Sequence, residues 1–419
     1  MLSKASADSI QRQIEGMAAF NATPEYGTTR ILFTKQELEN RAYVKEEMRR
    51  LGLTVTEDAI GNIYATHKGT EPELAPVWTG SHIDTVPNAG NFDGMAGVVC
   101  GLEAMRLFNE CGVSHKRDIS VVVYTSEEPT RFGLSCLGSR AMSGDMLLEE
   151  TKKIFDQSGR TLYDKLVELG YPVDEKYTDI LKRPGDVYAA VELHIEQNNR
   201  LEKMNLPIGI VKKICAPSNY VVEVTGVQSH AGGTDMTDRR DAFAAVCEME
   251  LALEKLAREC PSEYNTATIG HLEVLPNAMN VIPGKVTFTI DIRDCNWNTK
   301  QTLIEAFQSD FRRIAANRGV SISIHEDNND APLTCNEKII SIIEESCKNR
   351  QLGYTKLISG PYHDTLFVGR FAPAAMIFVP SKNGISHSPD EWTDYGQLAQ
   401  GADVLAETLL KLANSEKAL

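Results

Sequence analysis

The sequence predicts an α/β domain that is interrupted by a smaller α+β domain. Its length of 419 residues exceeds the size at which one hydrophobic core usually stops growing, which favours two domains. Short apolar runs alternate with helical patterns in the first half of the chain, longer alternating strands follow from about residue 212, and the first pattern returns near residue 329. We therefore expect a discontinuous α/β domain over residues 1–211 and 329–419, with an inserted domain over residues 212–328.

The first segment alternates helix and strand signals. Thr34 to Glu37 reads T-x-x-E, a capping box, and apolar residues follow it at helical spacing, so we expect a helix that ends near Gly52. Three short apolar runs predict strands that helices bury on both faces, with a further helix over 96–108. These strands are expected at 75–78, 119–124 and 187–193.

The inserted segment changes to strands of alternating polarity and long helices. Their order, strand, helix, strand, strand, helix, strand, is that of a small α+β sandwich with a four-stranded sheet and two helices. The strands are expected at 220–224, 266–275, 285–292 and 320–325, and the helices at 241–258 and 299–316. The last segment is expected to contain a helix at 337–349, a strand at 374–379 and a closing helix at 395–412.

The composition excludes several classes of protein. With 42% hydrophobic and 24% charged residues and no biased tract, the chain is neither disordered nor fibrous. Its net charge of −15 repels phosphate backbones and anionic lipids, so we expect neither nucleic acid nor a membrane surface as a partner. No run reaches the roughly 18 apolar residues of a spanning helix, no signal peptide is visible at the start, and the nine cysteines show no CxxC pairing. The expected compartment is a reducing cytoplasm.

Paired polar residues follow two of the predicted strands. His82 and Asp84 lie two residues apart in GSHID, so on a continuing strand both side chains point to the same side. A carboxylate at that spacing can orient a metal-ligating imidazole, although a structural hydrogen-bonded pair is the commoner use of HxD. Glu127 and Glu128 are adjacent at a strand end, where they repel each other unless a cation or a shared proton compensates. On a solvated loop the same pair would carry no functional meaning.

The stronger signal is a coincidence of position. Taken singly, each histidine of this kind is more often a core residue, and an Asp before a helix is more often a cap. Several such residues, however, lie just beyond the carboxyl ends of predicted strands, the edge where open α/β sheets bind ligands. Three imidazoles with carboxylates and no cysteine suit Zn²⁺ or Mn²⁺. The candidate metal ligands are His82, Asp93, Glu128, His194 and His387.

Five ligands are more than one structural zinc ion needs. If Asp93 bridges, one site contains His82 with His194 and a second contains the other two ligands. Two ions that share a carboxylate lower the pKa of a bridging water and polarise a carbonyl. Glu127 is then left to act as general base and proton shuttle.

In combination, these motifs resemble the di-metal amidohydrolases of the aminoacylase and carboxypeptidase G2 type of metallopeptidase superfamily, in the branch that hydrolyses N-carbamoyl amino acids, allantoate and ureidoglycolate. The resemblance implies a mixed-sheet di-metal hydrolase domain, an inserted dimerisation or lid domain, a homodimer, and two Mn²⁺ or Zn²⁺ ions per subunit. The matching stretches are GSHIDTVPNAGNFDG, SEEPTRFG, ELHIEQ, SHAGGTDMTDRRDA, PNAMNVIPGKVTFTIDIR and MIFVPSKNGISHSPDE.

The resemblance also implies roles for single residues. The five candidate ligands match the metal ligands of the family, Glu127 matches its base, and Asp84 matches the residue that orients the first histidine. His230 matches a histidine that stabilises the oxyanion from across the dimer interface; in isolation it would be read as a surface residue.

Substrate contacts follow from the same resemblance. Asn280 and Arg293 match the residues that grip the substrate carboxylate, to which Arg is suited through bidentate hydrogen bonds. Taken alone, Arg293 is more often a surface ion-pair partner. Gln197 and His363 are expected to contact the ureido group and its neighbouring polar atoms.

Within the branch, the stretches EEPTRFG, APS and YHDTLF look most like ureidoglycolate amidohydrolases. The expected reaction is hydrolysis of the terminal ureido group of a small anionic substrate. The favoured substrate is ureidoglycolate, which would give glyoxylate, ammonia and CO₂. Asn198 and the stretch 232–236 depart from the family pattern near the cleft, and Arg239-Arg240-Asp241 keeps a carbamoylase-like spelling. N-carbamoyl-L-amino acids and allantoate therefore remain alternative substrates. An aminoacylase or dipeptidase is a further alternative, and a non-catalytic scaffold is disfavoured because all ligands are present.

Overall fold

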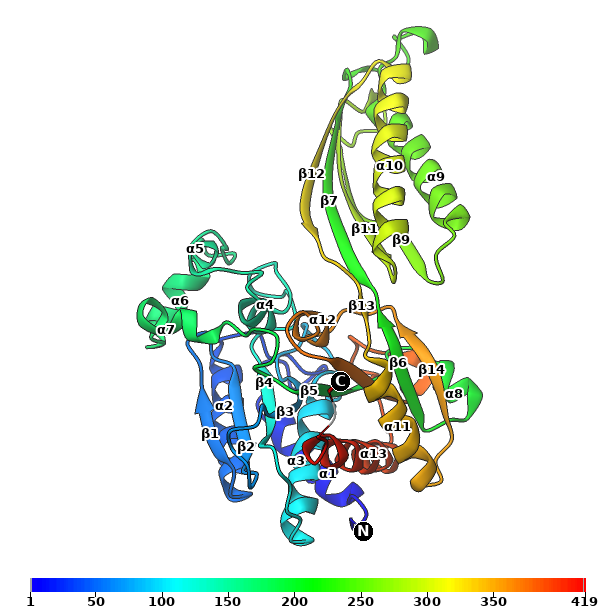
Figure 1. The fold of residues 1–419 in the computed structure, drawn as a ribbon. Helices are drawn as coiled ribbons and strands as arrows, with labels where there is room; N and C mark the ends of the chain where they lie inside the picture. The colour runs from blue at the N-terminus through cyan, green and yellow to red at the C-terminus, as the bar shows by residue number, and fades with distance from the viewer. Residues whose placement is uncertain (1, 417) are drawn as a thin grey trace. The chain divides into compact units, whose positions relative to one another are not determined.

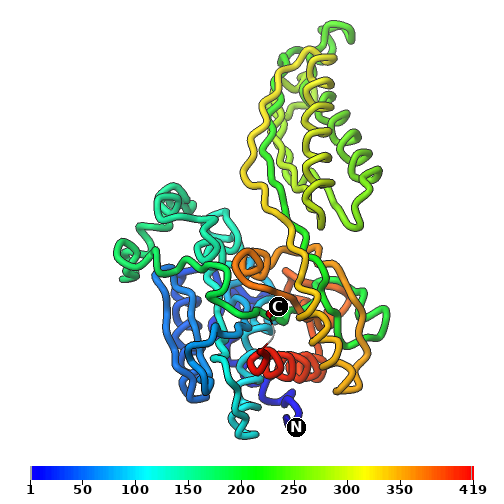
Figure 2. Tube along the Cα trace, in the orientation of Figure 1, coloured from blue at the N-terminus to red at the C-terminus, as the bar shows by residue number. Residues whose placement is uncertain are grey.

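The computed structural model describes residues 2–416 and 418–419, which form two compact units (Figure 2). The main unit contains the chain up to Lys212, Cys335–Leu357 and the chain from His363 onward. The small unit contains Lys213–Thr334 and Ile358–Tyr362. Its end at Thr334 and its short second segment differ from the expected boundary at 328, because they depend on long-range hydrogen bonds such as that from Cys215 N to Ser359 O, at 2.9 Å.

The sheet of the main unit is mixed, which confirms the predicted fold class (Figure 1). In the described chain it has nine strands in the order β1-β2-β4-β3-β5-β15-β6-β13, with β14 paired to β6, and the short β13 belongs to the segment that is grouped with the small unit. The central strands β4, β3, β5 and β15 run parallel, and β1, β2, β6 and β13 pair antiparallel. The strands are β1 Thr54–Glu57, β2 Ile63–His67, β3 Val77–His82, β4 Ile119–Tyr124, β5 Ala189–Ile195, β6 Ile208–Ile214, β13 Leu333–Thr334, β14 Tyr354–Ser359 and β15 Ala374–Val379.

The central strands are buried along their whole length because helices cover both faces of the sheet. The helices α3 and α13 pack against each other and cover β3, β5 and β15, and a second pair, α4 and α12, packs on β4, β5 and β15 (Figure 1). The helices of the main unit are α1 Ala7–Ala18, α2 Lys35–Arg50, α3 Met95–Glu110, α4 Leu137–Ser143, α5 Leu148–Thr151, α6 Leu162–Glu168, α7 Val173–Ile180, α8 Arg200–Met204, α11 Glu337–Asn349, α12 Thr365–Val368, α13 Tyr395–Ala413 and the 3-10 turn η2 Lys382–Gly384.

The predicted capping box at the start of α2 does not form. Thr34 makes no side-chain cap, and its hydroxyl donates to Ile31 O instead. Glu37 accepts from Phe33 N at 3.0 Å and forms a buried ion pair with Arg41. A charge-assisted bond inside the core is stronger than a neutral cap, so the glutamate turns inward.

The small unit is an antiparallel four-stranded sheet in the order β12-β7-β11-β9, with two helices on one face. Alternate residues of β11 are buried, and Phe288 and Ile290 pack with Phe307 and Phe311 of α10 in one apolar core. The elements are β7 Ala216–Thr225, β8 Ser229–His230, η1 Met236–Asp238, α9 Ala242–Glu259, β9 Asn265–Leu275, β10 Val281–Ile282, β11 Lys285–Asp294, α10 Trp297–Arg318 and β12 Ser321–Asn329.

None of the helices that the described residues form is both long and apolar enough to cross a membrane.

Candidate di-metal site

The carboxyl ends of the four parallel strands bring the predicted ligands together at one edge of the sheet of the main unit. His82 is the last residue of β3 and His194 lies within β5, one residue before its end, so both precede the positions expected for them. The ladder with β4 continues to the pair His82 and Tyr124, which keeps His82 in the strand. Glu128 follows β4, and His387 follows β15.

Asp93 lies at the centre of this group. Its Oδ1 is 3.1 Å from His194 Nε2 and 3.7 Å from His82 Nε2. Its Oδ2 is 3.0 Å from His387 Nε2, which lies 3.2 Å from Glu128 Oε1. The five ligands therefore form two three-residue groups that share Asp93, and the ligand atoms within each group lie within 4.8 Å of one another.

The tautomers of two histidines favour ion binding. His82 Nδ1 donates to the Asp84 carbonyl at 3.1 Å, and His194 Nδ1 donates to the Ile195 carbonyl at 2.9 Å. A carbonyl can only accept, so the proton of the neutral ring lies on Nδ1, and Nε2 presents its lone pair toward Asp93. Imidazole nitrogens and carboxylates without thiolates are a ligand set for Mn²⁺ or Zn²⁺, and the residues present thus fit two such ions.

The electrostatics of the group also agree with a cation site. Burial alone would raise the pKa of Asp93, but hydrogen bonds from His194, His387 and His82 outweigh it and hold that pKa well below its usual value. Burial lowers the pKa of His82, but the Asp84 and Asp93 carboxylates raise it well above the usual value. Protons that these carboxylates hold on the imidazoles must leave when a cation binds.

Gly94 allows the close approach that this geometry needs. Its φ is +68°, and a Cβ at this position would lie 2.5 Å from ring atoms of His82. Any side chain here would displace the imidazole, so the glycine after Asp93 is required.

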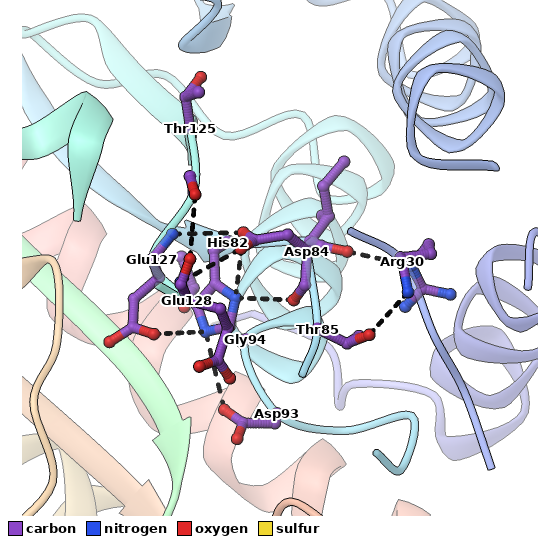
Figure 3. Close-up of polar contacts among 12 residues, drawn as sticks. Arg30, His82, Asp84, Thr85, Asp93, Gly94, Thr125, Glu127 and Glu128 are labelled. Atoms are coloured by element: carbon purple, nitrogen blue, oxygen red, sulfur yellow. Dashed lines mark hydrogen bonds and ion pairs between the residues drawn. The ribbon is translucent and has the colours of Figure 1, made fainter. Parts of the chain in front are cut away.

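Asp84 holds the turn that carries Glu127 and Glu128 (Figure 3). The sequence suggested that its carboxylate orients His82, but Oδ1 lies 3.6 Å from Nδ1, and the backbone carbonyl of Asp84 makes the closer contact. The carboxylate also accepts from Glu127 N at 3.3 Å and Glu128 N at 3.1 Å. Ser126, just before, has a φ of 54°, so the carboxylate supports a sharp turn.

Glu127 stands beside the two ligand groups without belonging to either. Its Oε2 is 4.0 Å from His82 Nε2, and only 8% of the residue is exposed. Burial, and next the charge of Glu128, raise its pKa well above the usual value. A buried carboxyl with a raised pKa is suited to accept and return a proton at neutral pH.

Gln197 and His363, the predicted ureido contacts, lie beside the ligands. Gln197 Nε2 donates to Asp93 Oδ2 at 2.9 Å, while its Oε1 is buried and has no hydrogen-bond partner in the structure. The His363 ring lies 4.6 Å from that of His194, centroid to centroid. With Glu192 these two histidines form a third possible ligand group, but Glu192 already accepts hydrogen bonds from Ser81 and Thr365.

The other predicted residues, His230, Asn280 and Arg293, belong to the small unit. His230 and Asn280 are neighbours, since Ala231 N donates to Asn280 O at 2.9 Å and His230 pairs with Val281. Arg293 lies near the other end of β11 and pairs with Asp291 at 2.9 Å. At about 3.4 Å per residue, the eight steps of β11 beyond the His230 end amount to roughly 27 Å. The structure does not bring Asn280 and Arg293 of one chain together.

Sequence reasoning missed Glu391. Its Oε1 accepts from Phe92 N at 2.9 Å and from Asp93 N at 3.1 Å. The signal that could have revealed it was a carboxylate four residues after the ligand histidine in SHSPDE.

The sequence resembles known proteins over nearly its whole length. The profile of Peptidase family M20/M25/M40 matches residues 78–411. A ureidoglycolate hydrolase of Oryza sativa subsp. japonica is 39% identical over 410 residues, 97% of this chain and 85% of the rice protein. An N-carbamoyl-L-amino acid amidohydrolase of Geobacillus stearothermophilus is 38% identical over 395 residues, 94% of this chain and 95% of that protein.

Solved structures agree with this result. The crystal structure of AtUAH in complex with glyoxylate matches with a TM-score of 0.88 at 38% identity, covering 99% of both chains. A hydantoinase/carbamoylase family amidase from Burkholderia multivorans matches with a TM-score of 0.87 at 31% identity, covering 98% of this chain and 99% of the other. The predicted resemblance is thereby confirmed: the chain belongs to peptidase family M20/M25/M40 and is a C–N hydrolase of its hydantoinase/carbamoylase branch.

Proposed function

We propose that the protein hydrolyses the terminal ureido group of a small carboxylate substrate with two divalent metal ions, and that ureidoglycolate is this substrate. The observation that carries the proposal is the division of the Asp93 carboxylate between two ligand groups, one at each oxygen. A carboxylate shared in this way can hold two ions close together, as two-ion hydrolysis needs.

The ions would be held by His82, Asp93 and His194 on one side and by Asp93, Glu128 and His387 on the other. When bound there, Mn²⁺ or Zn²⁺ polarises the ureido carbonyl and lowers the pKa of water. We favour Mn²⁺ because the resemblance of the sequence to the ureide-hydrolysing branch implies manganese before zinc.

Glu127 moves the proton in this reaction. Its carboxylate accepts a proton from the attacking water and returns it to the nitrogen that leaves from the ureido carbon. With ureidoglycolate, the cleaved C–N bond releases carbamate, which decays to CO₂ and ammonia, and hydroxyglycine, which loses ammonia to give glyoxylate. The raised pKa of the buried Glu127 carboxyl supports this double role.

Two side chains supply recognition in this proposal. Arg293 binds the substrate carboxylate through its planar guanidinium, which gives an acidic protein a local anchor for an anion. Gln197 Oε1, buried without a partner, accepts a hydrogen bond from the ureido NH₂. The NH₂ group of Gln197 is bound to Asp93, and its oxygen can still accept a hydrogen bond. Gln197 would therefore prefer a ureido group, whose NH₂ donates, over an N-acetyl group, whose methyl cannot.

The proposal includes a homodimer in which His230 acts on the site of the partner subunit. In support, roughly 27 Å of β11 lies between the His230 end and Arg293, so one chain cannot direct both at one small substrate. In this proposal, His230 of the partner subunit meets the substrate that Arg293 binds, and it stabilises the oxyanion.

The substrate choice draws on what similar proteins do. A relative 39% identical is a ureidoglycolate hydrolase, and AtUAH was crystallised with glyoxylate. The second candidate is an N-carbamoyl-L-amino acid, favoured by the 38% identical amidohydrolase and by the stretch Arg239-Arg240-Asp241.

Ammonia release tests the proposal. The metal-free protein is reconstituted with Mn²⁺ and offered ureidoglycolate, allantoate, a set of N-carbamoyl-L-amino acids and an N-acetyl amino acid. We expect the highest kcat/KM with ureidoglycolate and no activity without metal. A preference for another ureido acid would replace the substrate but keep the reaction. Activity on the N-acetyl amino acid alone would reject the proposal.

A further inference from the structure

Glu391 connects two loops that carry metal ligands from distant parts of the chain. One loop contains Asp93 and the other contains His387. Glu391 Oε1 accepts from the backbone N–H groups of Phe92 and Asp93, at 2.9 and 3.1 Å. Its Oε2 accepts from Ser386 Oγ at 2.8 Å. A single carboxylate therefore holds the backbone N–H groups of the ligand Asp93 and of the residue before it, together with the side chain of Ser386, which precedes the ligand His387.

The Glu391 side chain is fixed in place. The residue is 4% exposed, and a Cβ added at Gly90 would lie 2.4 Å from Glu391 Cβ, which shows how closely the two loops meet. The neighbouring Trp392 packs edge-on against Phe92 at a centroid distance of 5.2 Å. A residue held on two sides in this way loses little further entropy when it accepts its hydrogen bonds.

His387 needs such support more than the other ligand histidines do. Its φ is 54°, a region that non-glycine residues rarely adopt, and 48% of its side chain is exposed. Packing therefore does little to orient it. His82 and His194, by contrast, are buried in strands and have Nδ1 bonded to backbone carbonyls.

Ser386 completes the connection. Its Oγ lies 3.0 Å from Asp93 Oδ2, the same oxygen that faces His387 at 3.0 Å. Glu391 thus bonds to the backbone of Asp93 through one oxygen and to Ser386, the residue before His387, through the other. These bonds do not reach Oδ1, which faces His194 and His82.

We propose that Glu391 is a positioning residue that sets the geometry of the ion group formed by Asp93, Glu128 and His387, and has a much smaller effect on the group formed by His82, Asp93 and His194. This inference rests on the proposed two-ion function. It predicts that the two ions respond differently when the Glu391 carboxylate is removed.

Metal titration tests this difference without any assay of turnover. Mn²⁺ is titrated into chelator-treated protein by calorimetry, with bound metal counted by mass spectrometry, for the wild type, Glu391→Ala, Glu391→Gln and the exposed neighbour Asp390→Asn as control. The wild type and Asp390→Asn should bind two ions. In Glu391→Ala we expect one ion to keep its affinity within about 3-fold and the other to weaken about 10- to 100-fold, the usual effect of losing a partner of a ligand. Glu391→Gln should recover part of the loss, because its carboxamide oxygen still accepts from Phe92 and Asp93.

The outcomes separate the two proposals. A wild type that binds fewer than two ions overturns the proposed function itself. A wild type with two ions and a folded Glu391→Ala whose two affinities are unchanged, or are weakened equally, overturns the role of Glu391. If circular dichroism shows that Glu391→Ala does not fold, Ser386→Ala decides: weakening of one ion supports the inference, and two unchanged or equally weakened affinities contradict it.

Discussion

Asp93 Oδ2, in the loop after β3, lies 3.0 Å from His387 Nε2, in the segment after β15. The other oxygen of Asp93 faces His194 at 3.1 Å. One carboxylate therefore serves two ligand groups, and its low pKa keeps it charged for both.

Replacement of the proposed base should stop turnover without removing metal. Glu127 is outside both ligand groups, so Glu127→Gln should keep two ions and the fold. The amide cannot accept the proton of water, and we expect kcat to fall about 10²- to 10⁴-fold, the range for general acid–base catalysis. Ammonia release and metal content measured on the same sample check this. Turnover near that of the wild type would refute the assignment of the base.

Complementation tests whether His230 acts across the proposed dimer. A His230→Ala chain keeps its ligands, and an Asp93→Ala chain keeps its histidine. In a random mixture half of the dimers contain one chain of each kind, with one complete site of two, so we expect about a quarter of wild-type activity from two inactive parents. No recovery in heterodimers verified by differential tags would exclude action in trans.

Metal removal should lower thermal stability. Glu127, Glu128 and Asp93 place three carboxylates in a buried group, and chelation removes the cations that offset their repulsion. A ligand present at 1,000 times its Kd stabilises a fold by about 4 kcal/mol, so Tm should fall by several degrees with chelator and recover with Mn²⁺. Asp93→Ala should show a much smaller shift, and an equal shift in both proteins would contradict the account.

The small unit offers a pH prediction at Lys300, away from the proposed ligands. Its ammonium donates to the Ala216 and Pro217 carbonyls at 3.3 and 3.4 Å, and burial lowers its pKa to about 8. Between pH 8 and the ordinary lysine pKa near 10.5 the unfolded chain binds more protons than the folded one, so this group makes the protein more stable as pH rises through that window. Below pH 8 Lys300 is protonated in both states and adds no pH dependence to the stability.

Lys300→Met removes the titrating group. Its stability relative to the wild type should therefore fall by about 2 kcal/mol between pH 7 and pH 10, from the 1.4 kcal/mol that each unit of pKa shift represents. Urea unfolding of metal-free protein at both pH values measures the difference. A difference between the two proteins that stays constant with pH would show that Lys300 has an ordinary pKa.

Local patterns in the sequence predicted much of the fold. The helix at 337–349 and the strand at 374–379 have the expected bounds, and β9 and α13 differ by one residue at one end. The helices α11 and α13 have strong apolar periodicity, and β15 is a continuous apolar run. By contrast, β1, β2 and β6 were not predicted, because partly polar strands depend on their neighbours in the sheet.

The site was predictable as a set of ligands but not as a network. Asp93 and His387 could be placed at one edge because parallel strands end together. The bonds of Asp84 to the Glu127 turn and of Glu391 to Asp93 join segments far apart in the chain, and no spacing rule records such contacts. The failed capping box at Thr34 has a local cause instead: Arg41 lies one turn after Glu37 on the same helix and binds its carboxylate inside the core.

The most direct test of the central claim, that Asp93 is shared by two metal ions, is anomalous diffraction from crystals of the Mn²⁺-loaded protein. We predict two anomalous peaks per chain, one among His82, Asp93 and His194 and the other among Asp93, Glu128 and His387, with one Asp93 oxygen facing each. A single peak, or two peaks that Asp93 does not join, would contradict it.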